Sequence, residues 1–277
     1  MKGISVTLAE LIALRKWATH PLPHHAQNAQ PLGTLPKIRK GRGMSFAETR
    51  HYQAGDDIRH MAWRITARTG RPHVKIYQEE QDRAILLVVD FNPSMFFGTQ
   101  GAFKSTRAAQ LAALLAWRAH AQHDKIGGFL FASTQQHAFP PKSAMHHLMR
   151  FLKQLVGYSQ AFPASPPPAP TRLNTLLQQL RAVNKPGSLI VLMSDFYTLD
   201  ASCAPLLNQL SQHNDVWAVH VYDPLEHTPP PPGCYPISDG LRTHCLDTTD
   251  PHLRQTLQQV WQDHPHAIQQ HCRRHRL

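Results

Sequence analysis

The sequence predicts an α/β protein whose doubly wound, mostly parallel sheet is flanked by helices and preceded by a small N-terminal α+β segment. First, from residue 83 onward short apolar segments alternate with longer helical patterns, the order typical of strand–helix units. Second, residues 84–90 (AILLVVD) are almost continuously apolar, as expected of a central parallel strand buried on both faces. Third, 277 residues with 42% hydrophobic content are enough for a large core.

The N-terminal region combines a short helix with an irregular arm. Apolar residues recur at helical spacing over residues 5–17, where Thr7 and Glu10 form a capping box. Residues 20–45 then mix Pro, His, Gln and Gly with the basic cluster PKIRKGRG at 36–43. This composition is typical of an irregular arm that contacts a neighbour or a partner.

The segment before residue 82 carries one more predicted helix and one strand. An apolar stripe at i, i+3, i+4 and i+7 predicts a helix capped by the acidic pair 56–57, and its members are Ile58, Met61, Ala62 and Ile65. Residues 72–80 alternate as a strand does. Because the pattern changes near residue 82, we expect an N-terminal segment over residues 1–82 and a larger domain over residues 83–277.

The larger domain is predicted from its order of strands and helices. The expected strands are residues 84–90, 124–133, 135–141, 187–195 and 215–223. The expected helices are residues 103–122, 143–157, 171–183, 203–213 and 250–272. Proline-rich segments at 161–171 and 227–233 exclude helix and central strand, so both are expected to be stiff loops. This order predicts the doubly wound sheet.

Charge and hydropathy limit the partners and the location. A formal net charge of +11 favours acidic partners. No apolar stretch approaches the roughly 20 residues that a membrane-spanning helix needs, and Glu10 interrupts the N-terminal hydrophobic run that a secretory signal would require. We therefore expect a cytoplasmic protein without a membrane span.

The four cysteines carry no recognisable metal or disulfide pattern. Cys203, Cys234, Cys245 and Cys272 form no C-x-x-C pair and lie apart in the sequence. This spacing argues against a zinc ribbon and indicates no disulfide framework. We expect ordinary reduced thiols.

Polar residues follow two of the predicted central strands. Asp90 and Asp195 stand at the last positions of their strands, and Asn92 and Ser94 follow Asp90 at two and four residues. Ligands of such sheets bind at the carboxyl ends of the strands. Oxygen donors without Cys or His suit Mg²⁺, Mn²⁺ or Ca²⁺. The alternative is that each side chain only caps a local turn or helix.

Two stretches connect this pattern with known families. DFNPSM after a buried strand, with SDF ending a later strand, resembles the von Willebrand factor A domain and its metal-ion-dependent adhesion site. The run R-x-Y-x-x-G-D-D-x-R at 50–59, followed by W-[KR]-x-x-A-R at 63–68, resembles the signature of the bacterial domain-of-unknown-function fifty-eight family. This resemblance covers residues 41 to about 225.

The resemblance implies a set of metal ligands. They are Asp90, Asn92, Ser94, Thr171 and Asp195. Thr175 is a poorer choice than Thr171 because it lies inside the following helix. Asn92 departs from the usual Ser, so either a cation is held with altered geometry or the site has become a hydrogen-bonded loop.

The resemblance also implies a function. Members of the family are expected to be non-enzymatic adaptors that work with MoxR-type AAA+ ATPases. An adhesion-type site would use Mg²⁺, or else Mn²⁺ or Ca²⁺, to bind a carboxylate of the protein partner.

Two alternatives come from the residues themselves. The basic arm suggests nucleic-acid binding, although aromatic residues are not interleaved with the basic clusters. Asp90 could also be the nucleophile of a metal-dependent phosphoryl-transfer enzyme, but such enzymes need a second acid where Asn92 stands. We therefore expect no catalytic residues.

Overall fold

The computed structural model describes residues 3–18, 44–53, 56–79, 84–162, 169–228, 230–238 and 243–275. The chain forms two compact units, a larger one of residues 1–26 with 83–277 and a smaller one of residues 27–82. The N-terminal helix thus groups with the larger unit, although the pattern of the sequence changes only near residue 82. The basic cluster at 36–43 lies outside the described residues.

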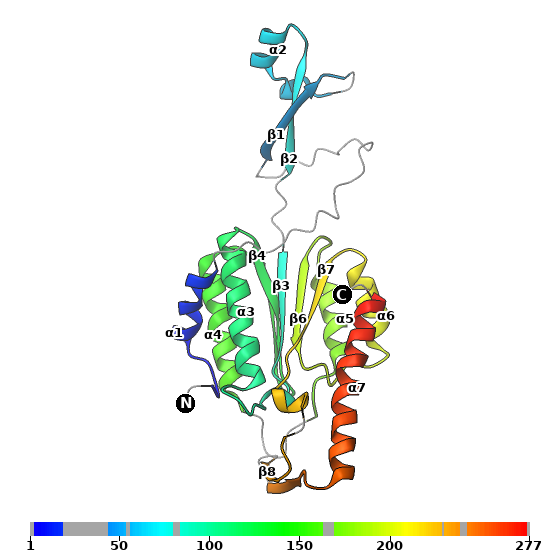
Figure 1. Cartoon of the computed structure of the whole chain (residues 1–277). Helices are drawn as coiled ribbons and strands as arrows, with labels where there is room; N and C mark the ends of the chain where they lie inside the picture. The colour runs from blue at the N-terminus through cyan, green and yellow to red at the C-terminus, as the bar shows by residue number, and fades with distance from the viewer. Residues whose placement is uncertain are drawn as a thin grey trace. The chain divides into compact units, whose positions relative to one another are not determined.

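The larger unit is built on a five-stranded sheet with the order β5-β4-β3-β6-β7 (Figure 1). Its strands are β3 (Ala84–Asp90), β4 (Lys125–Phe131), β5 (Gln136–Lys142), β6 (Leu189–Ser194) and β7 (Asp215–His220). All neighbours are parallel except β4 and β5. Since helices flank this mostly parallel sheet, the predicted fold class, an α/β fold with a doubly wound sheet, is confirmed.

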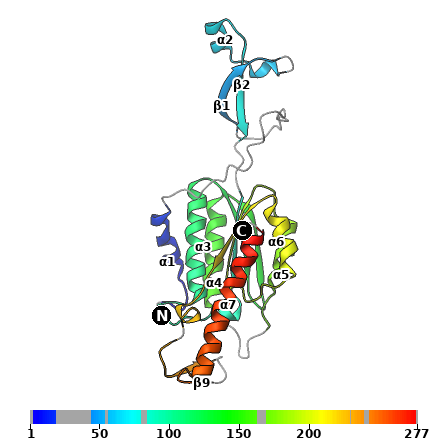
Figure 2. The ribbon, with the colours of Figure 1, turned by 45° about the vertical axis from the view of Figure 1, so that its right-hand side comes forward.

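Helices cover both faces of the sheet, as Figures 1 and 2 show. One face carries α1 (Leu8–Ala13), α3 (Lys104–Ala121) and α4 (Met145–Gln160), and the other carries α5 (Leu173–Val183), α6 (Cys203–Ser211) and α7 (Pro251–His275). Ile85, Leu87 and Val89 of β3 enter the first core, while Leu86 and Val88 enter the second. This alternation explains why the whole strand is apolar.

None of the helices in the described part of the chain has both the length and the apolar character needed to span a membrane.

The N-terminal helix is fastened to the larger unit. The predicted capping box is present, since Thr7 accepts the backbone N–H of Glu10 and Glu10 accepts that of Thr7. The indole N–H of Trp117 in α3 donates to the carbonyl of Leu11 (2.9 Å). Leu11 is fully buried in the core of this face. The short 3-10 helix η1 (Leu14–Trp17) continues α1.

The smaller unit is an antiparallel hairpin with two short helices. Its elements are β1 (Met44–His51), η2 (Ile58–His60), α2 (Trp63–Thr69) and β2 (His73–Glu79). The prediction of one continuous helix from Ile58 is wrong. Met61 forms a β-bridge with Val74, and the N–H of Ala62 donates to the carbonyl of His73. These bonds to the neighbouring strand interrupt the helix and leave Ile58 exposed.

A second hairpin corrects the expectation for the cysteines. Strands β8 (Cys234–Ser238) and β9 (Thr243–Asp247) pair antiparallel. Cys234 and Cys245 form a disulfide across them, with Cα atoms 5.7 Å apart. The prediction of reduced thiols is therefore wrong for this pair, because neither strand was recognised. Cys203 and Cys272 are free.

The sheet requires a glycine at position 128. Gly128 has φ +152°, and a Cβ atom there would lie 1.9 Å from the carbonyl oxygen of Leu87 on β3. We expect Gly128→Ala to lower the free energy of unfolding by roughly 3 kcal/mol through strain and overpacking. Gly157→Ala is the matched control, since its Cβ meets nothing within 4 Å in the last turn of α4. This control variant should raise the free energy of unfolding by about 0.5–1 kcal/mol, measured by denaturant unfolding.

Candidate functional site

Asp90 ends β3 as a buried carboxyl group whose two oxygens are both hydrogen-bonded. The backbone N–H of Asn92 donates to Oδ1 (2.8 Å), and the hydroxyl of Ser194 donates to Oδ2 (2.6 Å). Only 2% of Asp90 is exposed. The bond from Ser194 crosses from β6, the neighbouring parallel strand, so the ends of the two central strands are joined at this edge.

The two predicted acids do converge. Burial first, and then the charge of Asp195, raise the pKa of Asp90 to about 7, against the opposing effects of its two hydrogen bonds and of Lys104. Burial therefore favours the protonated form of this carboxyl group.

The side chain of Asn92 binds the backbone of Thr171. Asn92 Oδ1 accepts the N–H of Thr171 (2.9 Å), and Asn92 Nδ2 donates to the carbonyl of Thr171 (3.2 Å). The hydroxyl of Thr171 donates to the carbonyl of Ala132 at the end of β4 (2.8 Å). Asn92 thus fastens the loop after β3 to the segment before α5. Ser94 lies in the short 3-10 helix η3 (Pro93–Met95) and is half-buried.

A lysine lies against the second acid. Lys104 is the first residue of α3, and its Nζ lies 3.0 Å from Asp195 Oδ2 and 2.7 Å from Glu226 Oε1. The side chains of Lys104 and Asp195 are each 2% exposed. Glu226 ends the 3-10 helix η4 (Pro224–Glu226), where its other oxygen accepts the N–H of Asp223. One ammonium group therefore links α3, the end of β6 and η4.

Four residues at this edge were missed from the sequence: Lys104, Ser194, Glu226 and His264. His264 donates from Nε2 to the backbone carbonyl of Asp195 (2.7 Å), which fixes the tautomer or charge state of its ring. A signal for Lys104 did exist. A cation at a helix N-terminus opposes the helix dipole, so a lysine there indicates a carboxylate partner nearby. For Glu226 the signal was the capping box that it forms with Asp223.

The predicted ligands are engaged by other groups of the protein. Both oxygens of Asp90 and the amide oxygen of Asn92 already accept hydrogen bonds within the protein. Asp195 is paired with Lys104, which supplies the positive charge that a metal would bring. In the described ranges, no group of three or more His, Cys, Asp or Glu side chains is placed to hold a metal ion. Coordination by these five residues therefore stays a prediction from the resemblance.

Removing the lysine should destabilise the protein strongly. Lys104→Met leaves Asp195 and Glu226 without their cation, and breaking a buried pair in this way costs about 3–5 kcal/mol of unfolding free energy. Lys153→Met on the exposed face of α4 is the control and should stay within about 0.5 kcal/mol of the wild type. Urea unfolding measures both.

Asp90 should make stability fall as the pH rises. Its pKa is about 7 when folded against 3.8 in the unfolded chain, so between these values the folded protein keeps a proton that the unfolded chain has released. Asp90→Asn removes this effect, and the wild type should lose roughly 2–3 kcal/mol more than the variant between pH 5 and 8. Asp263→Asn, on the exposed side of α7, should keep the wild-type slope. An unchanged slope in Asp90→Asn would contradict the assignment.

Comparison with curated proteins finds similar bacterial chains. An uncharacterized protein of Mycobacterium bovis and one from each of two strains of Mycobacterium tuberculosis are 29% identical to this chain over 211 residues. The aligned region covers 76% of this chain and 63% of each relative. This chain therefore matches less than two thirds of the length of these relatives.

Two solved structures and one family model are also similar to this chain. BatB from Bacteroides thetaiotaomicron is 13% identical with a TM-score of 0.42, covering 65% of this chain and 87% of that one. An aerotolerance-related membrane protein from Bacteroides fragilis is 14% identical with a TM-score of 0.39, covering 66% and 87%. The family model described as protein of unknown function DUF58 matches residues 48–267. The resemblance read from the signature at 50–68 is thus confirmed, and this chain belongs to the DUF58 family.

Proposed function

We propose that this chain is a non-enzymatic adaptor that binds a protein partner, and that the partner is a MoxR-type AAA+ ATPase. The observation that carries the non-enzymatic part is the closed network at the carboxyl edge of the sheet. Asp90 and Asp195 are each 2% exposed and are bound by Ser194 and Lys104, respectively. A substrate cannot reach these carboxylates without breaking the network.

Phosphoryl transfer is the weaker alternative for the same reason. A nucleophilic Asp90 would have to be exposed and ionised, whereas it is 2% exposed and its burial raises its pKa to about 7. The position for the second acid is held by Asn92, whose side chain binds the backbone of Thr171. An amide in that position cannot act as a general acid or base.

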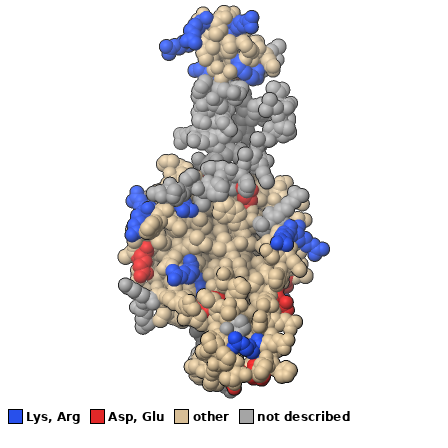
Figure 3. All heavy atoms as spheres, in the orientation of Figure 1, with Lys and Arg blue, Asp and Glu red and all other residues tan. Residues whose placement is uncertain are grey.

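The smaller unit supports a protein partner. It exposes 59% of Ile58 and 62% of Trp63. Figure 3 shows Lys and Arg side chains over the visible face of this unit, and Arg59, Arg64 and Arg68 are exposed. Exposed apolar side chains mark interaction sites, and Trp and Arg are enriched among the residues that contribute most binding energy. We therefore place the main contact on this surface and expect its partner to be acidic.

The test is a binding measurement with a MoxR-type AAA+ ATPase of the same organism, without nucleotide. Trp63→Ala should weaken binding at least about tenfold. Trp17→Ala is the matched control, because Trp17 is 61% exposed on the larger unit, and it should bind as the wild type does.

The same assay tests the metal. We expect equal binding with excess Mg²⁺ and with a chelator, because Lys104 already neutralises Asp195. Binding that needs Mg²⁺ and is lost in Asp90→Ala would restore the metal site. Binding to random duplex or single-stranded DNA, with no binding to the ATPase, would favour the nucleic-acid alternative instead.

A further inference from the structure

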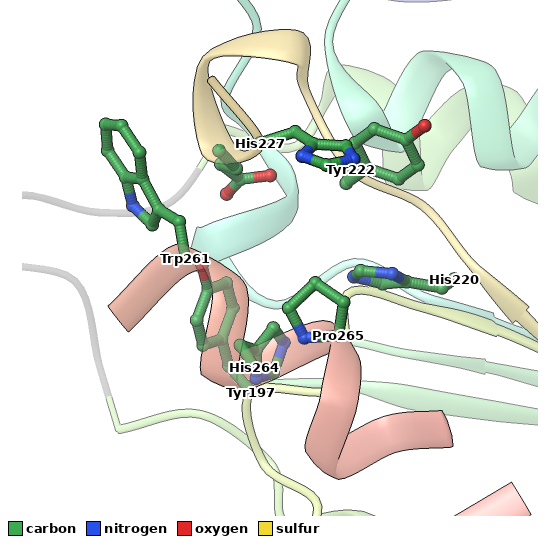
Figure 4. Close-up of a pocket in the computed structure, with 8 residues that line it drawn as sticks. Tyr197, His220, Tyr222, His227, Trp261, His264 and Pro265 are labelled. Carbon is green, nitrogen blue, oxygen red and sulfur yellow. The ribbon is translucent and has the colours of Figure 1, made fainter. Parts of the chain in front are cut away.

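A pocket of about 110 Å³ lies beside the lysine network, between the ends of β6 and β7 and helix α7 (Figure 4). It is lined by an unusual number of rings, namely Tyr197, His220, Tyr222, His227, Trp261 and His264. Pro265 and the carboxylate of Glu226 complete it. Glu226 also binds Lys104, so the pocket and the network share one residue. Neither the family resemblance nor the predicted ligand set includes this pocket.

The rings form two opposed sides. Figure 4 shows Tyr222 and His227 on one side of the hollow and Tyr197, His264 and Pro265 on the other. Tyr197 and His264 stack with centroids 4.3 Å apart and planes 4° apart, which makes this side rigid. Tyr222 and His227 lie 5.9 Å apart at 70°. The hollow is large enough for a small side-chain group, and a nucleotide is too large for it.

The charge around the pocket favours a cation. Asp195 and Glu226 share the single ammonium group of Lys104, so negative charge is left over. Glu226 lines the pocket, so part of this charge faces it.

We propose that this pocket binds the guanidinium group of an arginine side chain of the protein partner. The proposal rests on the proposed function and adds a chemical specificity to it. A guanidinium ion is planar and weakly hydrated and stacks on aromatic faces, and it can donate to a carboxylate at its edge. The ammonium group of a lysine is compact and strongly hydrated, so it gains less between two rings.

The test uses short capped peptides as probes. Acetyl-Gly-Arg-Gly-amide is compared with the same peptide containing citrulline, which is uncharged and similar in shape, and with the lysine peptide. NMR titration follows the indole N–H of Trp261 and the ring signals of His220 and His264. We expect saturable shifts with the arginine peptide and affinities about tenfold lower for the other two.

Variants locate the binding. Trp261→Leu removes one ring and leaves the Lys104 network intact, and it should weaken arginine binding about tenfold when the histidine signals are followed. Val260→Ala is the control, since Val260 is exposed on the same helix and does not line the pocket. It should bind the arginine peptide as the wild type does.

The outcomes separate this proposal from the proposed function. Equal affinity for the citrulline or lysine peptide, or no saturable shift with arginine, overturns the pocket assignment. Arginine binding without any ATPase binding upholds the pocket and overturns the proposed partner. ATPase binding without any arginine binding upholds the proposed partner and overturns the pocket assignment.

Discussion

The carboxyl edge of the sheet depends on one buried ion pair network, that of Lys104 with Asp195 and Glu226. Taking three charges out of water is costly, and their mutual attraction offsets this cost only while all three remain together. The network therefore fixes the N-terminus of α3, the end of β6 and η4 relative to one another. A hydrogen bond from His264 to the backbone carbonyl of Asp195 also ties α7 to this network. The edge where the resemblance implies a metal site is here occupied by a lysine.

Beside the Lys104 network, the residues of the loop after β3 have a structural role. Where the family resemblance implies ligands, Asp90 and Asn92 act as structural acceptors, one for Ser194 and the other for the backbone of Thr171. The departure from Ser to Asn at position 92 is consistent with this role, because an amide both accepts and donates and can hold a backbone N–H and carbonyl together. The sequence left two possibilities for Asn92, a cation held with altered geometry or a hydrogen-bonded loop. These contacts support the hydrogen-bonded loop.

The network also shapes its surroundings. Because Glu226 belongs both to the network and to the ring-lined pocket, a group bound in the pocket would contact the same residue that pairs with Lys104. In our proposals the larger unit supplies this pocket and the smaller unit supplies exposed Trp63 with its arginines. Two surfaces of opposite charge preference would favour a partner that carries both acidic and arginine-bearing segments.

Local physics let the sequence alone determine most of the fold and part of the site. The continuous apolar run of β3, the Thr7–Glu10 capping box and the convergence of Asp90 with Asp195 follow from periodicity, local hydrogen bonds and strand order. Other features depend on contacts between distant segments. The hydrogen bond from Ala62 to His73 interrupts a helix that periodicity favours, and pairing of β8 with β9 joins Cys234 to Cys245. Lys104 meets Glu226 only because folding brings together residues 122 positions apart. Tertiary packing decides these long-range contacts, because no local pattern encodes which partner a buried charge pairs with.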